Sequence, residues 1–409
     1  MPELSYAPSA RAPQFPPRPV LLFYCQHSLG IGHLTRSFAL ARALAGPFRV
    51  VFLNGGPVPA GVPVPETMEV VNLPPLGMDD GHNVVSRGTA HGVVEAQLQR
   101  HELIVEAARM LRPAVVLVEL FPFGRKKFAG EILALIRAAR AQRRDVRVVC
   151  SLRDILVDAR RDQQHHDDRA RWLANRYFDA VMVHSDPAFA RIEESFHPSR
   201  PLTVPVHYTG YVVPARHVED AVPRAERLLV SAGGGIVGHP LFAAALAAQT
   251  RLWPASRRPM RIVAGPFLPE AEWVALQGMA HGCPGVELVR HVPDMVAEMR
   301  RARLSISQCG YNTALDIVVA GVPALVVPYA APGENEQSRR AEALAALGAV
   351  RHLPASQLET GRLAAAIDEA LTFTPRPAAL ALDGARHSAE LLAALLPGHA
   401  QPVGRALHA

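Results

Sequence analysis

A turn between a buried strand and a helix, late in the chain, has residues suited to binding an anion. The segment LSIS at residues 304–307 is predicted to be a short buried strand that ends at residues 308–310, and a helix is expected to begin at Asn312 or Thr313. The first N–H groups of a helix lack partners within it, and the helix dipole favours negative charge there. Gly310 has no side chain that would keep a diphosphate away. The residues predicted to surround a diphosphate are Gln308, Gly310, Asn312 and Thr313.

Further polar residues follow this turn at fixed distances. Asp316 lies about one helical turn later, where its carboxylate could accept hydrogen bonds from two ribose hydroxyls. The helix is expected to end at Gly321, an apolar strand follows, and the next loop carries Glu336 and Gln337. We expect Glu336 and Gln337 to bind the hydroxyls of a sugar. The alternative is an ordinary strand-loop-helix of some other doubly wound protein.

The order of these residues resembles the donor-binding signature of GT-B glycosyltransferases, both the plant secondary-product type and bacterial family 28. The matching parts are the run QCGYNT, Asp316, Gly-Val-Pro at residues 321–323 and Glu-Gln at residues 336–337. Two departures are Gln308, where a phosphate-binding His is usual, and Asp316, where a ribose-binding Glu is usual. The resemblance implies an α/β GT-B fold, in which two Rossmann-like doubly wound domains face each other across a cleft.

The resemblance also implies a reaction and its partners. The expected activity is inverting transfer of a sugar from a nucleoside diphosphate sugar, expected to be a UDP-sugar, to an unidentified hydroxyl of a lipid or small molecule. The chain as a whole is similar to bacterial family 28-like proteins. The nucleotide sugar is expected to be a co-substrate, and no metal or other cofactor is expected. Val292 and Met295, which precede the signature, are placed by position against the base.

A second candidate group lies near the start of the chain. An apolar run at residues 20–25 ends in the loop QHSLGIGH, and a helix is expected over residues 34–44. His33, at the end of this loop, could accept the proton of an attacking hydroxyl, because imidazole titrates near neutrality. Glu119 ends another apolar run, where plant-type enzymes carry the aspartate that orients the histidine. Alternatively, His33 caps or packs its helix and Glu119 is only a strand-end carboxylate.

Glycines follow the strand that opens the second half of the chain. The run Gly-Gly-Gly at residues 233–235 comes directly after LLVSA and resembles the glycine loop of the bacterial transferases. Backbone N–H groups around Gly234 are therefore expected to contact the donor diphosphate. A tight strand-to-helix turn is the simpler alternative.

Strands alternate with helices in both halves of the chain, which predicts two parallel sheets with binding sites at their carboxyl ends. A Pro-rich stretch and a charged linker separate the halves. The expected organisation is a disordered segment 1–16, an acceptor domain 17–214, a linker 215–226, a nucleotide-sugar-binding domain 227–384, a helix 385–398 that the resemblance brings back to the first domain, and a tail 399–409.

The composition is that of a soluble protein. The chain has 409 residues, 49% of them hydrophobic, which is enough for two domains with separate cores. Neither a signal peptide nor an apolar run of about 18 residues is evident, so a cytoplasmic protein is expected, with at most peripheral contact with the inner membrane. The net charge of +6 comes from arginines spread along the chain, without a nucleic-acid-binding module. The scattered cysteines are expected to be reduced: Cys25, Cys150, Cys283 and Cys309.

Two acidic stretches are poor metal sites. The run at residues 162–168, DQQHHDD, places adjacent side chains in different directions. Asp79 and Asp80 lack the acid-x-acid spacing of metal-dependent transferases. A metal-free mechanism is therefore predicted.

Two other functions fit the same residues. The segment IGHLTRSFALARAL resembles the start of nucleotide-sugar hydrolases of the pseudaminic acid pathway, in which water replaces the acceptor. The departures at Gln308 and Asp316 are also compatible with a nucleotide-sugar-binding protein that has no turnover.

Overall fold

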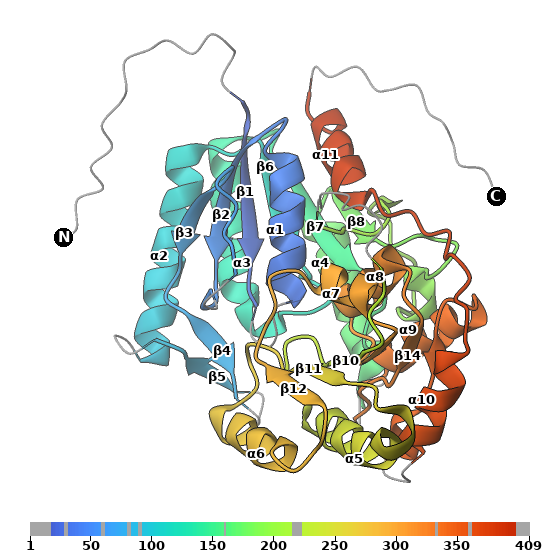
Figure 1. The fold of residues 1–409 in the computed structure, drawn as a ribbon. Coiled ribbons are helices and arrows are strands. Elements are labelled where there is room, and N and C mark those ends of the chain that lie inside the picture. Colours follow the sequence, from blue (N-terminus) through green and yellow to red (C-terminus); the bar gives the residue numbers. More distant parts are fainter. Residues whose placement is uncertain are drawn as a thin grey trace.

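The chain forms two domains, each built on a parallel sheet (Figure 1). The computed structural model describes residues 18–27, 32–58, 62–79, 83–88, 92–158, 161–214, 223–331, 334–358 and 362–397. Several sequence predictions lie outside these residues: the segment 1–16, the tail 399–409, most of the linker, residues 28–31 of the first loop, and Asp80.

The first domain contains a seven-stranded sheet in the order β3-β2-β1-β6-β7-β8-β9. Its strands are β1 (Val20–Cys25), β2 (Arg49–Asn54), β3 (Glu69–Asn72), β6 (Val115–Glu119), β7 (Arg147–Arg153), β8 (Ala180–His184) and β9 (Val206–Tyr208). Alternate residues of β1 enter opposite cores: Leu22 and Tyr24 pack on one face, and Leu21 and Phe23 on the other. Because helices cover both faces, the strand is apolar along its whole length.

Helices on both faces complete the first domain. They are α1 (Gly32–Leu44), α2 (Val93–Leu111), α3 (Ala129–Gln142) and α4 (Gln163–Tyr177), with the short 3-10 helices η1 (Lys126–Phe128) and η2 (Ile192–Glu194). The strands β4 (Leu76–Met78) and β5 (Val84–Ser86) form a separate antiparallel pair. Helix α1 starts at Gly32, two residues earlier than the sequence pattern predicts.

The second domain has a six-stranded parallel sheet in the order β12-β11-β10-β13-β14-β15. Its strands are β10 (Leu228–Ser231), β11 (Met260–Val263), β12 (Val286–Val289), β13 (Leu304–Ser307), β14 (Ala324–Val326) and β15 (Arg351–His352). Its helices are α5 (His239–Ser256), α6 (Glu270–Ala280), α7 (Met295–Arg301), α8 (Tyr311–Ala320), α9 (Glu336–Ala346), η3 (Ala355–Gln357) and α10 (Leu363–Leu371). The predicted α/β class with two doubly wound domains is thus confirmed.

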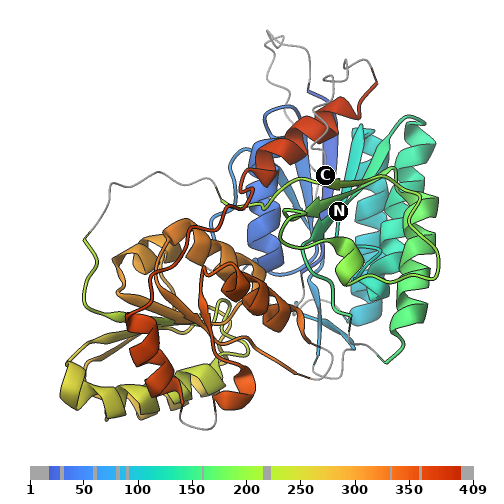
Figure 2. The same cartoon turned by 90° about the vertical axis from the view of Figure 1, so that its right-hand side faces the viewer.

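The last helix, α11 (Gly384–Ala394), lies against the first domain although it follows the second in sequence (Figure 2). Leu392 and Leu396 pack into the same core as Leu34 and Phe38 of α1. Arg147, at the start of β7, donates a hydrogen bond from Nε to the carbonyl of Leu395 at 2.9 Å. The apolar face of α11 therefore connects the end of the chain to the first sheet.

A buried ionic network supports the first domain between α2 and α3. Arg100, which is fully buried, donates to both carboxylate oxygens of Glu131, at 2.5 and 3.0 Å. It also donates to the side-chain oxygen of Gln26 and to the carbonyl of Gly55. A buried guanidinium is tolerated because its N–H groups have partners.

The described residues also bear on the predictions about membranes, metals and cysteines. In them, no helix is long and apolar enough to cross a membrane. Nor do three or more His, Cys, Asp or Glu side chains gather there in a group that could hold a metal ion. The four cysteines are free thiols, of which Cys25, Cys150 and Cys309 are buried.

Candidate functional site

The candidate residues lie where the strand order of each sheet reverses. In the first sheet, β1 and β6 are neighbours, and their carboxyl ends lead to His33 and to Glu119. In the second sheet, β10 and β13 are neighbours, and their carboxyl ends lead to the glycine run and to Gly310. Helices that leave neighbouring strands in opposite directions open a crevice at such a point. The topology therefore accounts for the position of both groups.

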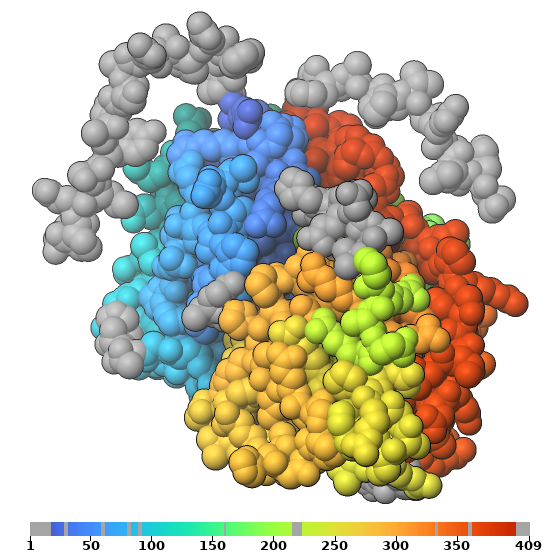
Figure 3. Space-filling model, in the orientation of Figure 1, coloured from blue at the N-terminus to red at the C-terminus, as the bar shows by residue number. Residues whose placement is uncertain are grey.

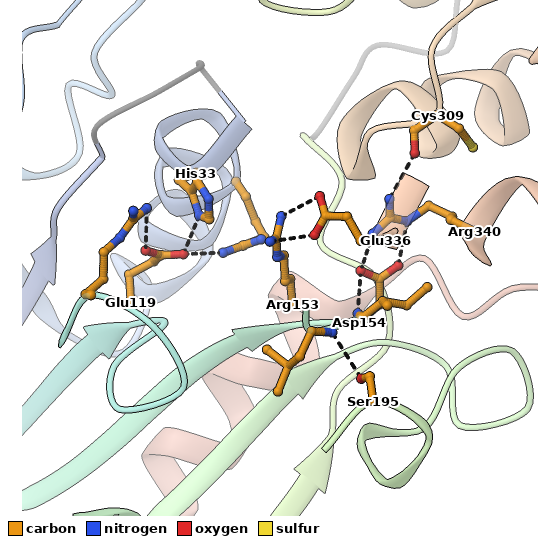
Figure 4. A network of polar contacts seen from close by, with 12 residues as sticks. His33, Glu119, Arg153, Asp154, Ser195, Cys309, Glu336 and Arg340 are labelled. Carbon is orange, nitrogen blue, oxygen red and sulfur yellow. Dashed lines mark hydrogen bonds and ion pairs between the residues drawn. The ribbon is translucent and has the colours of Figure 1, made fainter. Parts of the chain in front are cut away.

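His33 and Glu119 are in direct contact, although 86 residues separate them in sequence (Figure 4). Nδ1 of His33 lies 2.6 Å from Oε1 of Glu119. A neutral imidazole that donates from Nδ1 to a carboxylate has its lone pair on Nε2. The pair is thus arranged for Nε2 to accept a proton.

Two arginines that the sequence did not place beside Glu119 complete this group. Arg36 donates from Nη2 to the same Glu119 oxygen at 2.6 Å, and Arg125 lies 3.7 Å from the other oxygen. Arg36 is three residues after His33, a spacing that places both side chains on one face of α1. That spacing is the signal by which the sequence could have indicated Arg36.

Arg125 reaches Glu119 because the chain folds back sharply after β6. Leu120 and Arg125 have positive φ angles of 64° and 56°, a conformation that non-glycine residues rarely adopt. The Leu120 carbonyl accepts a hydrogen bond from the Gly124 N–H at 2.9 Å, which closes the turn. Sequence spacing alone does not show this return of the chain.

The charges around the pair set its protonation. Burial, together with Arg125 and Arg153, lowers the pKa of His33 to about 4, against the opposing attraction of Glu119. Burial by itself would raise the pKa of Glu119, but His33, Arg125 and Arg36 lower it below its usual range. At neutral pH the pair is therefore a neutral imidazole beside a carboxylate.

The turn after β13 leaves an open space above Gly310. Helix α8 starts at Tyr311, slightly earlier than predicted, and Gly310 is its N-cap with φ −63° and ψ 159°. A Cβ atom built on Gly310 would have no neighbour within 4 Å. Asn312 donates to the carbonyl of Gly32, next to His33, at 3.3 Å. The first turn of α8 therefore adjoins the start of α1.

Both domains line one pocket of about 390 Å³ beside this turn. The predicted site residues in its wall are Val292, Met295, Asn312, Thr313 and Asp316. The first domain contributes Thr35, Phe38 and Arg42 of α1, among others. Figure 3 shows the seam between the blue first domain and the yellow-to-orange second domain.

The other predicted site residues, Gly310, His33 and Glu119 among them, do not line this pocket. Gln308 donates to the carbonyl of Val237 at 2.8 Å and borders a different cavity. Gly234 is absent from the pocket wall, whereas its neighbour Gly233 is part of it. Glu336 accepts a hydrogen bond from Arg153 of the first domain at 2.9 Å.

Gln337 also has a partner within the protein. Its side-chain carbonyl accepts hydrogen bonds from the backbone N–H groups of Cys309, at 3.0 Å, and of Tyr329, at 3.1 Å. These N–H groups follow β13 and β14, so Gln337 ties the ends of two neighbouring strands to α9. Its amide group is the part that is left for a ligand.

Two Rossmann-like domains that meet at their switch points define the GT-B class of fold. Within it, residues 269–396 of this chain match the glycosyltransferase family 28 C-terminal domain. The donor-binding signature lies inside that match, so its predicted resemblance to family 28 is confirmed.

Comparisons with whole proteins agree with this placement. The UDP-N-acetylglucosamine–N-acetylmuramyl-(pentapeptide) pyrophosphoryl-undecaprenol N-acetylglucosamine transferase of Mesorhizobium japonicum is 35% identical over 157 residues, which cover 38% of this chain and 41% of the relative. This chain thus spans less than half the length of that relative.

Two solved structures share the fold over nearly the whole chain. The glycotransferase of kitacinnamycin has a TM-score of 0.57 and 18% identity, covering 93% of this chain and 100% of the other. MurG of Acinetobacter baumannii has a TM-score of 0.55 and 16% identity, covering 91% and 99%. At these identities the likeness establishes the fold alone.

Proposed function

We propose that this protein is an inverting, metal-independent glycosyltransferase that uses a nucleoside diphosphate sugar, a UDP-sugar by preference. One observation carries the proposal: the first turn of α8, which follows the open space above Gly310 in the part that matches family 28, contacts Gly32 of the other domain, the residue before His33 of the His33–Glu119 pair. A donor bound at Gly310 would present its sugar toward a base on the opposite wall. Opposed walls are what an inverting displacement requires.

The proposed reaction moves one proton and one sugar. Nε2 of His33 takes the proton of the acceptor hydroxyl as that oxygen forms a bond to the anomeric carbon. The bond from this carbon to the diphosphate breaks, and its electron pair leaves with the diphosphate. Backbone N–H groups in the first turn of α8 stabilise the developing charge. Glu119 holds the imidazole in the tautomer that leaves Nε2 free.

The donor side of the proposal draws on the relatives, whose names include UDP-N-acetylglucosamine. Asp316 is proposed to bind the ribose, and Val292 and Met295 the base, because all three line the pocket next to Asn312. The acceptor is proposed to be a hydroxyl of a lipid or small molecule, reached in the cytoplasm or at the membrane face. Metal independence stays a prediction, which activity in the presence of EDTA tests.

The function is tested with purified protein and a panel of UDP-, TDP- and GDP-sugars. Calorimetry identifies the donor, and release of the nucleoside diphosphate is then measured with and without cell extract. Release that depends on extract and is lost in His33→Ala supports a transferase. Release of free sugar without extract supports the hydrolase instead. Binding without any release indicates a non-catalytic binding protein, and binding of no donor contradicts the whole proposal.

Gly310→Ala is expected to weaken nucleoside diphosphate binding by about tenfold or more without destabilising the fold. The added methyl group meets no protein atom within 4 Å, so it occupies only the space proposed for phosphate. The φ and ψ angles of Gly310 suit any residue. Calorimetry with UDP measures the affinity, and thermal unfolding measures stability.

Gly278→Ala is the matched control, because a Cβ atom at Gly278 also meets nothing within 4 Å, but on α6, away from the pocket. It should leave the affinity for UDP unchanged. Equal affinity in the Gly310→Ala protein would contradict the position of the phosphate.

The transfer rate is expected to fall on acidification only near pH 4. His33 acts as a base in its neutral form, and burial lowers its pKa to about 4. A profile of kcat/KM against pH should therefore stay level from pH 7 to about 5, whereas an ordinary histidine would lose half its activity near pH 6.5.

Thermal unfolding at each pH separates this effect from loss of structure. Because the pKa of His33 is lower in the folded chain than in the unfolded one, its burial costs no stability above about pH 6.5 and progressively more below it. An activity limb near pH 6.5 in a fully folded protein would contradict the lowered pKa.

A further inference from the structure

The backbone of Cys309, just before Gly310, is held on both sides by one face of α9. Its N–H donates to Oε1 of Gln337 at 3.0 Å, and its carbonyl accepts from Nη1 of Arg340 at 2.9 Å. Gln337 and Arg340 are three residues apart and so share a face of the helix. The peptide groups that lead into Gly310 therefore depend on two α9 side chains.

Arg340 is in turn held by the other domain (Figure 4). Its Nε and Nη2 atoms each donate to a different oxygen of Asp154, both at 2.8 Å. The side chains are 2% and 0% exposed, so this paired contact is shielded from water. Burial alone would lower the pKa of Arg340 and raise that of Asp154, but each partner keeps the other charged.

Tyr311, directly after Gly310, also connects the domains. Its hydroxyl donates to the carbonyl of His184 at 3.1 Å and accepts from the N–H of Val212 at 3.2 Å. The guanidinium groups of Arg36 and Arg340 lie 5.3 and 6.0 Å from the centre of its ring. The residues on both sides of Gly310 are thus attached to the first domain. Tyr311 contacts its backbone directly, and Cys309 is connected to Asp154 through Arg340.

Other contacts between the same two segments lack this property. Arg339 pairs with Asp158, and Arg153 pairs with Glu336, so these contacts join α9 to the end of β7 and to the segment that follows it. No hydrogen bond described for these side chains goes to residues 309–311. Arg340 differs from Arg339 because it joins the first domain to the turn at Gly310.

We propose that Arg340 is a positioning residue for the donor diphosphate, and that Asp154 of the opposite domain holds Arg340 in place. The inference rests on the proposed function. When the domains are closed, Asp154 fixes the guanidinium, which fixes the Cys309 carbonyl and hence the N–H groups around Gly310. When they separate, the turn loses one of its two supports, so donor affinity depends on closure.

The test compares Arg340→Lys with Arg339→Lys by calorimetry with UDP, TDP and GDP. Lysine keeps the charge, but its single ammonium cannot bridge both Asp154 oxygens and the Cys309 carbonyl. Arg340→Lys is expected to weaken binding of the preferred nucleotide about tenfold and to speed amide hydrogen exchange at residues 309–311. Arg339→Lys, which alters the partly buried neighbouring contact with Asp158, should change affinity less than about twofold, because that contact does not reach residues 309–311.

Thermal unfolding keeps a structural role apart from a positioning role. A merely structural residue would lower the melting temperature and leave the affinity of the folded protein unchanged, a result that overturns the inference. If Arg340→Lys does not fold, Asp154→Leu combined with Arg340→Met removes both buried charges and should fold. This double variant is also expected to bind about tenfold more weakly, and unchanged affinity in it likewise overturns the inference.

The two levels of the proposal fail differently. A wild-type protein that binds none of the three nucleotides contradicts the proposed function and the inference with it. If the wild-type protein binds one of the nucleotides and Arg340→Lys binds it equally tightly, only the role of Arg340 is contradicted.

Discussion

His33→Ala is expected to lower kcat/KM for sugar transfer by about 10²- to 10⁴-fold while leaving donor affinity within about twofold of the wild-type value. The variant removes the base beside Glu119. Among the described side chains, Arg36 also contacts Oε1 of Glu119, but a guanidinium cannot accept a proton and so cannot replace His33. Nucleoside diphosphate release in the presence of acceptor measures the loss, and calorimetry measures donor binding.

His33→Asn is the matched variant for this experiment. Its amide can still donate a hydrogen bond to Glu119 but has no basic nitrogen, so the buried carboxylate keeps a partner. Its activity should be as low as that of His33→Ala. Transfer at the wild-type rate in either variant would exclude His33 as the base.

Glu119→Gln is expected to destabilise the protein by about 3–5 kcal/mol. It is also expected to lower the transfer rate of the molecules that remain folded. Glu119 is fully buried and is the carboxylate partner of Arg36, itself only 2% exposed in its side chain. The variant leaves that guanidinium without a buried counter-charge. It also removes the negative charge that favours the Nδ1–H tautomer of His33. Urea unfolding measures the first effect, and kcat measured well below the melting temperature measures the second.

Glu131→Gln provides the control, because it disturbs a comparable buried pair with Arg100 in the same domain, but not His33. It should lose stability and, once folded, retain activity. Since the Glu119 pKa is lowered by folding, its contribution to stability is present above the ordinary carboxyl pKa and is lost as pH falls through the folded value. Wild-type stability in Glu119→Gln would contradict the ionic role.

Local patterns in the sequence were sufficient for the elements that carry the site. The apolar runs of β1 and β6 are continuous because both faces of the first sheet are covered, and glycine, proline and polar residues mark where those runs end. The same reasoning predicts α8 after Gly310, with a start one or two residues too late. Helix ends depend on the capping geometry of a few atoms, which residue types indicate only approximately.

The donor-binding signature could be predicted from the sequence for a related reason. Its residues lie within one strand-turn-helix unit and the next, so their separation in sequence determines their separation in space. The site roles assigned to Gln308, Glu336 and Gln337 came from this spacing, yet their side-chain oxygens or nitrogens have partners in the protein. The spacing of residues in sequence predicts where the backbone of a residue lies. It does not show which nearby protein atoms form hydrogen bonds with the side chain in place of a ligand.

By itself, the sequence determined the two doubly wound halves, the glycine turn at Gly310, and the candidates His33 and Glu119, because each depends on neighbours close along the chain. Tertiary structure alone decided which side chains meet across 83 to 186 residues: Arg36 with Glu119, and Arg340 with Asp154. Those pairs form because two sheets bring their carboxyl ends together. The strength of a buried charge pair depends on distance and on exclusion of water, and neither quantity is encoded in local spacing.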